Sequence, residues 1–78
     1  MKVLFFAQLR AVTATAESEV EADGVDAAGL WAILSGRWPG LAAHRDHTRL
    51  ARNGAYAGEG EMFSADDEVA LIPPVSGG

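Results

Sequence analysis

Two short segments of the chain are apolar at consecutive positions, and in a third segment charged and uncharged residues alternate. Residues 2–9 contain the run Val-Leu-Phe-Phe, and residues 69–72 read Val-Ala-Leu-Ile. Strands that are apolar on both faces are typical of the centre of a sheet. Within residues 15–22, the alternate positions 17, 19 and 21 are glutamate, which predicts a half-exposed strand at an edge, with residues 11–14 as the preceding turn.

A helix is predicted between Asp26, which suits the N-cap position, and Pro39, which cannot continue a helix. Four apolar side chains between them share one helical face: Leu30, Ile33, Leu34 and Trp38. Trp31 lies off this stripe, so we expect it to be partly exposed. Residues 41–47 fit a second, short helical turn.

Asn53-Gly54 predicts a tight hairpin turn, because both central positions of such a turn need a positive φ. Residues 49–52 and 55–57 would be its strands, and residues 58–67 a loop. The element order predicts an α+β fold with one main helix on one face of a small mixed sheet. A right-handed crossover would let the first and last strands pair in parallel.

Length and composition restrict the function classes. The 78 residues suffice for one domain, and the chain has no cysteine, so disulfides and thiolate chemistry are excluded. The net charge of −5 argues against electrostatic binding of nucleic acid or anionic membranes. No segment has the apolar length of a membrane span, and the first residues fit a strand better than a signal peptide. We expect a cytoplasmic protein.

No set of side chains forms a recognisable active site. His44 and His47 lack further metal ligands, and Asp66-Asp67-Glu68 lacks calcium-loop spacing. No serine lies in a nucleophile motif, and no glycine pattern fits a phosphate loop. We therefore expect no bound cofactor and no metal, in a domain too small to enclose a substrate.

The end of the chain is the remaining candidate for chemistry. Gly77 and Gly78 leave the main chain unrestricted and the α-carboxylate open to attack. Pro73-Pro74 is stiff and would direct residues 75–78 away from the sheet, over about 13–14 Å at full extension. The candidate reactive group is the Gly78 carboxylate, and a frayed, inert terminus is the alternative.

Both ends of the chain resemble a known family. The ending Pro-Pro-Val-Ser-Gly-Gly, the opening Lys-Val-Leu-Phe-Phe-Ala-Gln-Leu-Arg and the central Asn-Gly are similar to the small subunit of molybdopterin synthase, a sulfur carrier. Arg52 stands where that family usually has valine. Asp66 stands where it usually has glycine, which a left-handed backbone would favour.

The resemblance implies a ubiquitin-like β-grasp domain over residues 1–74 and a flexible diglycine tail over residues 75–78. It implies that an E1-like enzyme uses ATP to adenylate Gly78 and that sulfur then replaces the adenylate. The resulting thiocarboxylate would donate sulfur to a cyclic pyranopterin monophosphate inside a heterotetrameric synthase. The catalytic side chains would belong to the large subunit, and Gly77 and Gly78 would be this chain's reacting end.

The resemblance also assigns the surface that docks on partners. We expect it to comprise Phe6, Ile72, Pro73, Pro74, Val75 and Ser76, although a uniformly apolar strand does not reveal which face is exposed. The partner would meet an acidic chain. Three alternatives stay open: a carrier for thiamine or cysteine synthesis, a protein modifier that forms isopeptide bonds, and an interaction module with an inert tail.

Overall fold

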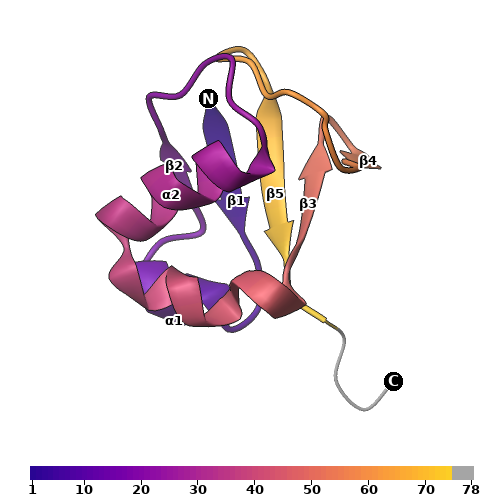
Figure 1. Cartoon of the computed structure of the whole chain (residues 1–78). Coiled ribbons are helices and arrows are strands. Elements are labelled where there is room, and N and C mark those ends of the chain that lie inside the picture. The colour runs from indigo at the N-terminus through magenta and orange to yellow at the C-terminus, as the bar shows by residue number, and fades with distance from the viewer. Residues whose placement is uncertain (75–78) are drawn as a thin grey trace.

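The computed structural model describes residues 1–74 and shows one mixed sheet in the order β2-β1-β5-β3-β4 (Figure 1). Its strands are β1 (Lys2–Phe5), β2 (Glu17–Glu19), β3 (Arg49–Arg52), β4 (Ala55–Tyr56) and β5 (Glu68–Ile72). β1 and β5 pair in parallel, and the other neighbours are antiparallel. The sequence-based prediction of central first and last strands and a charged edge strand is confirmed.

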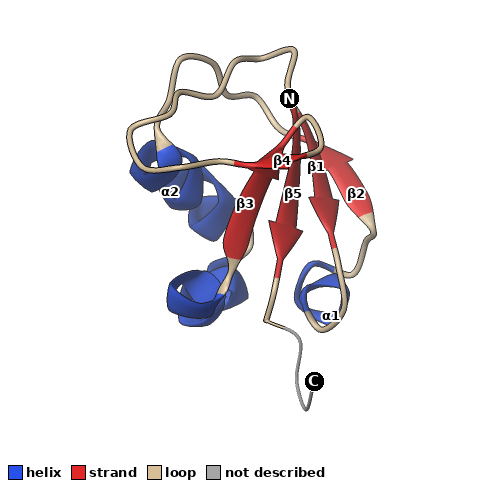
Figure 2. Ribbon diagram, turned by 90° about the vertical axis from the view of Figure 1, so that its right-hand side faces the viewer, coloured by secondary structure: helices blue, strands red, loops and turns tan. Residues whose placement is uncertain are grey.

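Three helices accompany the sheet: α1 (Leu9–Thr13), α2 (Ala27–Arg37) and the 3₁₀ helix η1 (Pro39–His47). α2 and η1 lie on the same side of the sheet, and α1 lies beside η1 at the end where β1 stops (Figure 2). This arrangement is the α+β, ubiquitin-like β-grasp fold that the element order and the resemblance predicted.

The two central strands bury alternate side chains beneath the helices. Val3 and Phe5 of β1 and Val69 and Leu71 of β5 are at most 1% exposed. Burying a side chain of this size contributes about 1.5–3 kcal/mol, so the β1–β5 pair provides much of the core's stability. The Phe5 ring also packs edge-on against Trp38, with their centroids 5.0 Å apart.

The predicted limits of the main helix are confirmed. The Asp26 side chain accepts a hydrogen bond from the Gly29 amide at 2.8 Å, a cap that contributes about 1 kcal/mol. The prediction for Trp31 was wrong, since Trp31 is 4% exposed while Ile33 is 36% exposed. The reason is tertiary: Val25 bridges to Phe63, which adds an apolar wall on the Trp31 side of α2.

The first connection also differs from the prediction. β1 ends at Phe5, and α1 occupies positions expected to be strand and turn. Leu9 is fully buried at its start, and the Thr13 hydroxyl donates to the Leu9 carbonyl at 3.1 Å. A helix of five residues is too short to show a periodic apolar pattern, so the sequence contained no clear signal for it.

Candidate partner-docking surface at the C-terminal end

The last described residues leave from the middle of one end of the sheet (Figure 1). β5 ends at Ile72, Pro73 is buried, and Pro74 is exposed. The predicted site residues Val75, Ser76, Gly77 and Gly78 lie outside the described residues. The structure therefore shows where on the sheet the segment that carries Gly78 begins.

One face of the sheet, termed the open face, carries the side chains that alternate with the buried ones. The strand registers put Leu4, Arg49, Tyr56, Ala70 and Ile72 on it. Leu4, Ala70 and Ile72 are half-buried, and Tyr56 is 57% exposed. At the far end of this face, the Lys2 ammonium lies 3.4 Å from Glu17 and 3.7 Å from Glu68, and these carboxylates raise the pKa of Lys2.

Phe6 and Ile72, which are predicted to dock on a partner, each follow one residue of the last β1–β5 pair. Phe5 pairs with Leu71 in the parallel register; Phe6 directly follows the end of β1, and Ile72 is the last residue of β5. Phe6 is 46% exposed, and Ile72 is half-buried on the open face. In the pairs Phe5/Phe6 and Leu71/Ile72, the more exposed members are therefore Phe6 and Ile72, a question that the sequence left undecided.

A shallow cleft of about 250 Å³ lies at the base of the C-terminal segment. Its lining consists of His47, Arg49, Tyr56, Ile72, Pro73 and Pro74. The Arg49 guanidinium carbon lies 4.0 Å from the centre of the Tyr56 ring, a cation–π contact that holds the side chain over the sheet. Sequence reasoning missed Arg49 and Tyr56, although the register of the Asn53-Gly54 hairpin puts both on one face.

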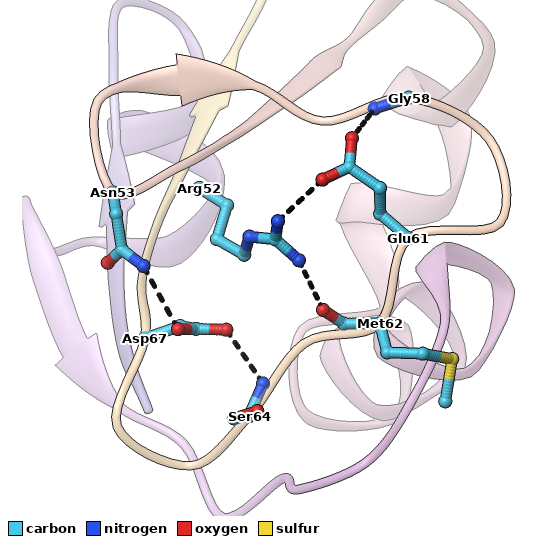
Figure 3. A network of polar contacts seen from close by, with 7 residues as sticks. All are labelled: Arg52, Asn53, Gly58, Glu61, Met62, Ser64 and Asp67. Carbon is cyan, nitrogen blue, oxygen red and sulfur yellow. Dashed lines mark hydrogen bonds and ion pairs between the residues drawn. The ribbon is translucent and has the colours of Figure 1, made fainter.

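A polar network at the other end of the sheet joins the hairpin to the loop of residues 58–67 (Figure 3). Arg52 lies 2.6 Å from a Glu61 carboxylate oxygen and donates to the Met62 carbonyl at 2.5 Å. Glu61 in turn accepts from the Gly58 amide. Arg52, which stands where the resemblance leads one to expect valine, therefore finds its partners in the loop.

Asn53 and Asp67 complete this network. The Asn53 side chain donates to Asp67 at 3.0 Å and accepts from the Glu68 amide at 2.9 Å. Asp67 also accepts from the Ser64 amide at 2.7 Å, and this bond, with that from Asn53, lowers the pKa of Asp67. Asp66 does not have a positive φ, so the expected left-handed strain at this position was wrong.

The turn itself matches its prediction, with φ values of +52° at Asn53 and +88° at Gly54. Elsewhere within residues 1–74, no three histidine or carboxylate side chains come close enough to hold a metal ion. Over the same part of the chain, no helix is long and apolar enough to cross a membrane.

Comparisons with known proteins identify the family of this chain. A profile of the ThiS family matches residues 3–78. The chain belongs to the ThiS family. It is 39% identical over 80 residues to the molybdopterin synthase sulfur carrier subunit of Drosophila erecta, an alignment that covers 97% of this chain and 88% of the fly protein. The resemblance inferred from the two ends of the sequence is therefore confirmed.

The chain is also similar to a protein with a different name. The small archaeal modifier protein 1 of Haloferax volcanii is 37% identical over 87 residues, with both chains covered completely. The crystal structure of that protein superposes with a TM-score of 0.84 at 35% identity, covering 100% of this chain and 98% of the other. The chain thus matches relatives with two different names over nearly its whole length, and the archaeal one shares its fold.

Proposed function

We propose that this chain is the sulfur-carrying small subunit of a molybdopterin synthase, with the main-chain carboxylate of Gly78 as its reacting group. The observation that carries the proposal is the extent of the family match, which continues through both terminal glycines. Relatives named for this function match over nearly the whole chain in organisms as distant as flies and Escherichia coli.

The proposed chemistry begins with activation, because a carboxylate is a poor electrophile. An E1-like enzyme joins the Gly78 carboxylate to the AMP portion of ATP and releases pyrophosphate. Hydrosulfide then attacks the acyl carbon, AMP leaves with the bonding electron pair, and loss of a proton gives the thiocarboxylate. ATP is consumed by the activating enzyme and is not a cofactor bound by this chain.

Sulfur transfer would take place in the large subunit. The thiocarboxylate sulfur attacks a carbon of cyclic pyranopterin monophosphate and displaces an oxygen substituent, which leaves with its bonding electron pair and takes up a proton. Water then cleaves the resulting thioester, which leaves the sulfur on the pterin and restores the Gly78 carboxylate. Two such transfers supply the two sulfur atoms of the dithiolene that binds molybdenum. Phe6 and Ile72 beside the departing chain would contact the large subunit, because exposed apolar groups at such a place favour protein association.

A second candidate function is protein modification. The match to the archaeal modifier over its whole length favours it. The activation step would be the same, but a lysine amine of another protein would attack the acyl carbon and form an isopeptide bond. The two functions therefore differ in the nucleophile that resolves the activated end.

Intact-protein mass spectrometry tests the proposal. The chain is incubated with the E1-like enzyme of the same genome, ATP and sulfide, and then with the large subunit and pterin substrate. We expect one oxygen at Gly78 to be replaced by sulfur and then restored as the dithiolene forms. A chain lacking Gly78 is the control and should fold normally without gaining sulfur. Conjugates to lysines of other proteins, with no sulfur transfer, would support the modifier function instead.

A further inference from the structure

The chain has few side chains that an activated carboxyl group could acylate. It contains one lysine, Lys2, and no cysteine, and its five other strongly basic side chains are arginines. Arginine stays protonated and does not act as a nucleophile, whereas the neutral amine of lysine does. Serine and threonine hydroxyls are weak nucleophiles without a base to activate them. Lys2 is therefore the one side-chain amine of this protein that an activated carboxyl end could acylate.

The Lys2 amine is held by carboxylates from both neighbouring strands. Its ammonium lies 3.4 Å from Glu17 of β2 and 3.7 Å from Glu68 of β5. Glu19, which lies opposite Lys2 in the register, has its carboxylate 3.5 Å from the amine of Met1. The Lys2 side chain is 44% exposed, so an electrophile in solution can reach it. Glu17 first and Glu68 second raise the pKa of Lys2, which reduces the fraction of neutral amine.

We propose that Lys2 is an acylation site that Glu17 and Glu68 withhold, so that the carrier is not consumed by its own activated end. The inference rests on the proposed function only for the source of the electrophile, the acyl adenylate of Gly78. In the reaction that the ion pairs oppose, the neutral Lys2 amine attacks the acyl carbon and an amide bond forms. AMP leaves with the bonding electron pair, and the nitrogen releases a proton to solvent. A Gly78 joined to Lys2 in this way can no longer accept sulfur.

The same ion pairs join β1 to its two neighbours at the surface of the sheet, and this structural role can be separated from the chemical one. Exposed ion pairs contribute little to stability. Neutral glutamine in place of Glu17 and Glu68 should therefore leave the fold intact while it frees the Lys2 amine. The reactivity of Lys2 can thus be measured on a folded protein.

Acetylation of the isolated chain by an N-hydroxysuccinimide ester tests the withholding of Lys2 without any partner protein. The initial rate at Lys2 is measured at about pH 8, with fragmentation in the mass spectrometer to locate the acetyl group. The test variant is Glu17→Gln plus Glu68→Gln. The matched control, Glu59→Gln plus Asp66→Asn, removes two carboxylate charges at exposed positions of the distant loop. Within residues 1–74, neither control carboxylate forms an ion pair.

We expect Lys2 of the test variant to react about three- to fivefold faster than that of the wild type, because two exposed ion pairs are lost. The difference should fade at about 0.5 M salt, and the control should stay within about 1.5-fold of the wild type. Circular dichroism confirms that each variant is folded. Unchanged reactivity of the test variant, or equal acceleration in the control, would overturn the inference.

A second experiment uses the electrophile of the proposed function. The chain is incubated with ATP and the activating enzyme of the same genome, without sulfide, and amide bonds at Lys2 within or between copies are measured by mass spectrometry. They should be rare in the wild type, about three- to fivefold more frequent in the test variant, and absent in Lys2→Arg. Equal yields in wild type and test variant, or amide bonds that persist in Lys2→Arg, would contradict the inference. If the wild type releases no pyrophosphate, the proposed function fails, while the acetylation rates still decide the role of Glu17 and Glu68.

Discussion

The Arg52 guanidinium lies 2.6 Å from the Glu61 carboxylate and bridges the hairpin to the loop that precedes the last strand. Both side chains are about one-third exposed, so the ion pair is neither buried nor fully solvated. Arg52 also donates to the Met62 carbonyl, and Glu61 accepts from the Gly58 amide. Arg52 thus has a local structural role in holding the loop against the hairpin.

Loss of this ion pair should lower stability slightly. We expect Arg52→Ala to reduce the free energy of unfolding by about 1 kcal/mol, and a double-mutant cycle with Glu61→Gln to give a coupling of about 0.5–1 kcal/mol. Urea denaturation measures both quantities. Arg45→Ala is the matched control, because Arg45 is exposed and forms no ion pair within residues 1–74. Zero coupling would show that the contact does not contribute.

Protonation of the Asp67 carboxylate should lower the stability of the protein in acid. Hydrogen bonds from Ser64 and Asn53 hold the pKa of Asp67 below its ordinary value of 3.8. A carboxylate whose pKa is depressed by folding stabilises the protein fully above its unfolded pKa, and the benefit is lost as pH falls through the folded value. The free energy of unfolding should therefore decrease below about pH 4.

Denaturation series across this pH range test the role of Asp67. Asp67→Asn should flatten the acid decline. Asp66→Asn is the control, because the Asp66 side chain forms no hydrogen bond within residues 1–74. If both variants changed the pH profile equally, the decline would reflect overall charge and not this hydrogen-bonded carboxylate.

Ala14 should be replaceable by glycine with a gain in stability. It ends α1 with a φ of +60°, which disfavours any residue with a Cβ, and its side chain is exposed. Relief of this strain should raise the free energy of unfolding by about 0.5–1 kcal/mol, measured by thermal or urea denaturation. Ala11→Gly, at an exposed position inside the same helix, should instead lower it by up to about 1 kcal/mol.

Phe6 should matter for association and not for folding. Because it is 46% exposed, Phe6→Ser should leave the melting temperature nearly unchanged. In the proposed complex it should weaken binding to the large subunit about tenfold, measured by calorimetry. Met62→Ser is the control, since Met62 is 51% exposed on the distant loop. Unchanged affinity of the Phe6 variant would remove Phe6 from the docking surface.

Much of the fold could be predicted because local interactions specify it. The Asp26 cap, the stop before Pro39 and the Asn53-Gly54 turn all depend on residues within a few positions of one another, and all three are confirmed. The doubly apolar strands are predicted at the sheet centre because central strands bury more of both faces than edge strands do.

Other features depended on contacts between distant segments. Consecutive apolar residues have no period, so only the packing of α2 and η1 decides that Phe5 points inward and Phe6 is exposed. Trp31 is buried because Phe63, thirty-two positions later, lies beside α2. The position of Arg49 and Tyr56 beside Pro73 and Pro74 likewise results from the order of strands. The sequence by itself determined the elements other than α1 and the candidate end of the chain, through short-range chemistry, whereas the tertiary structure decided which residues surround that end.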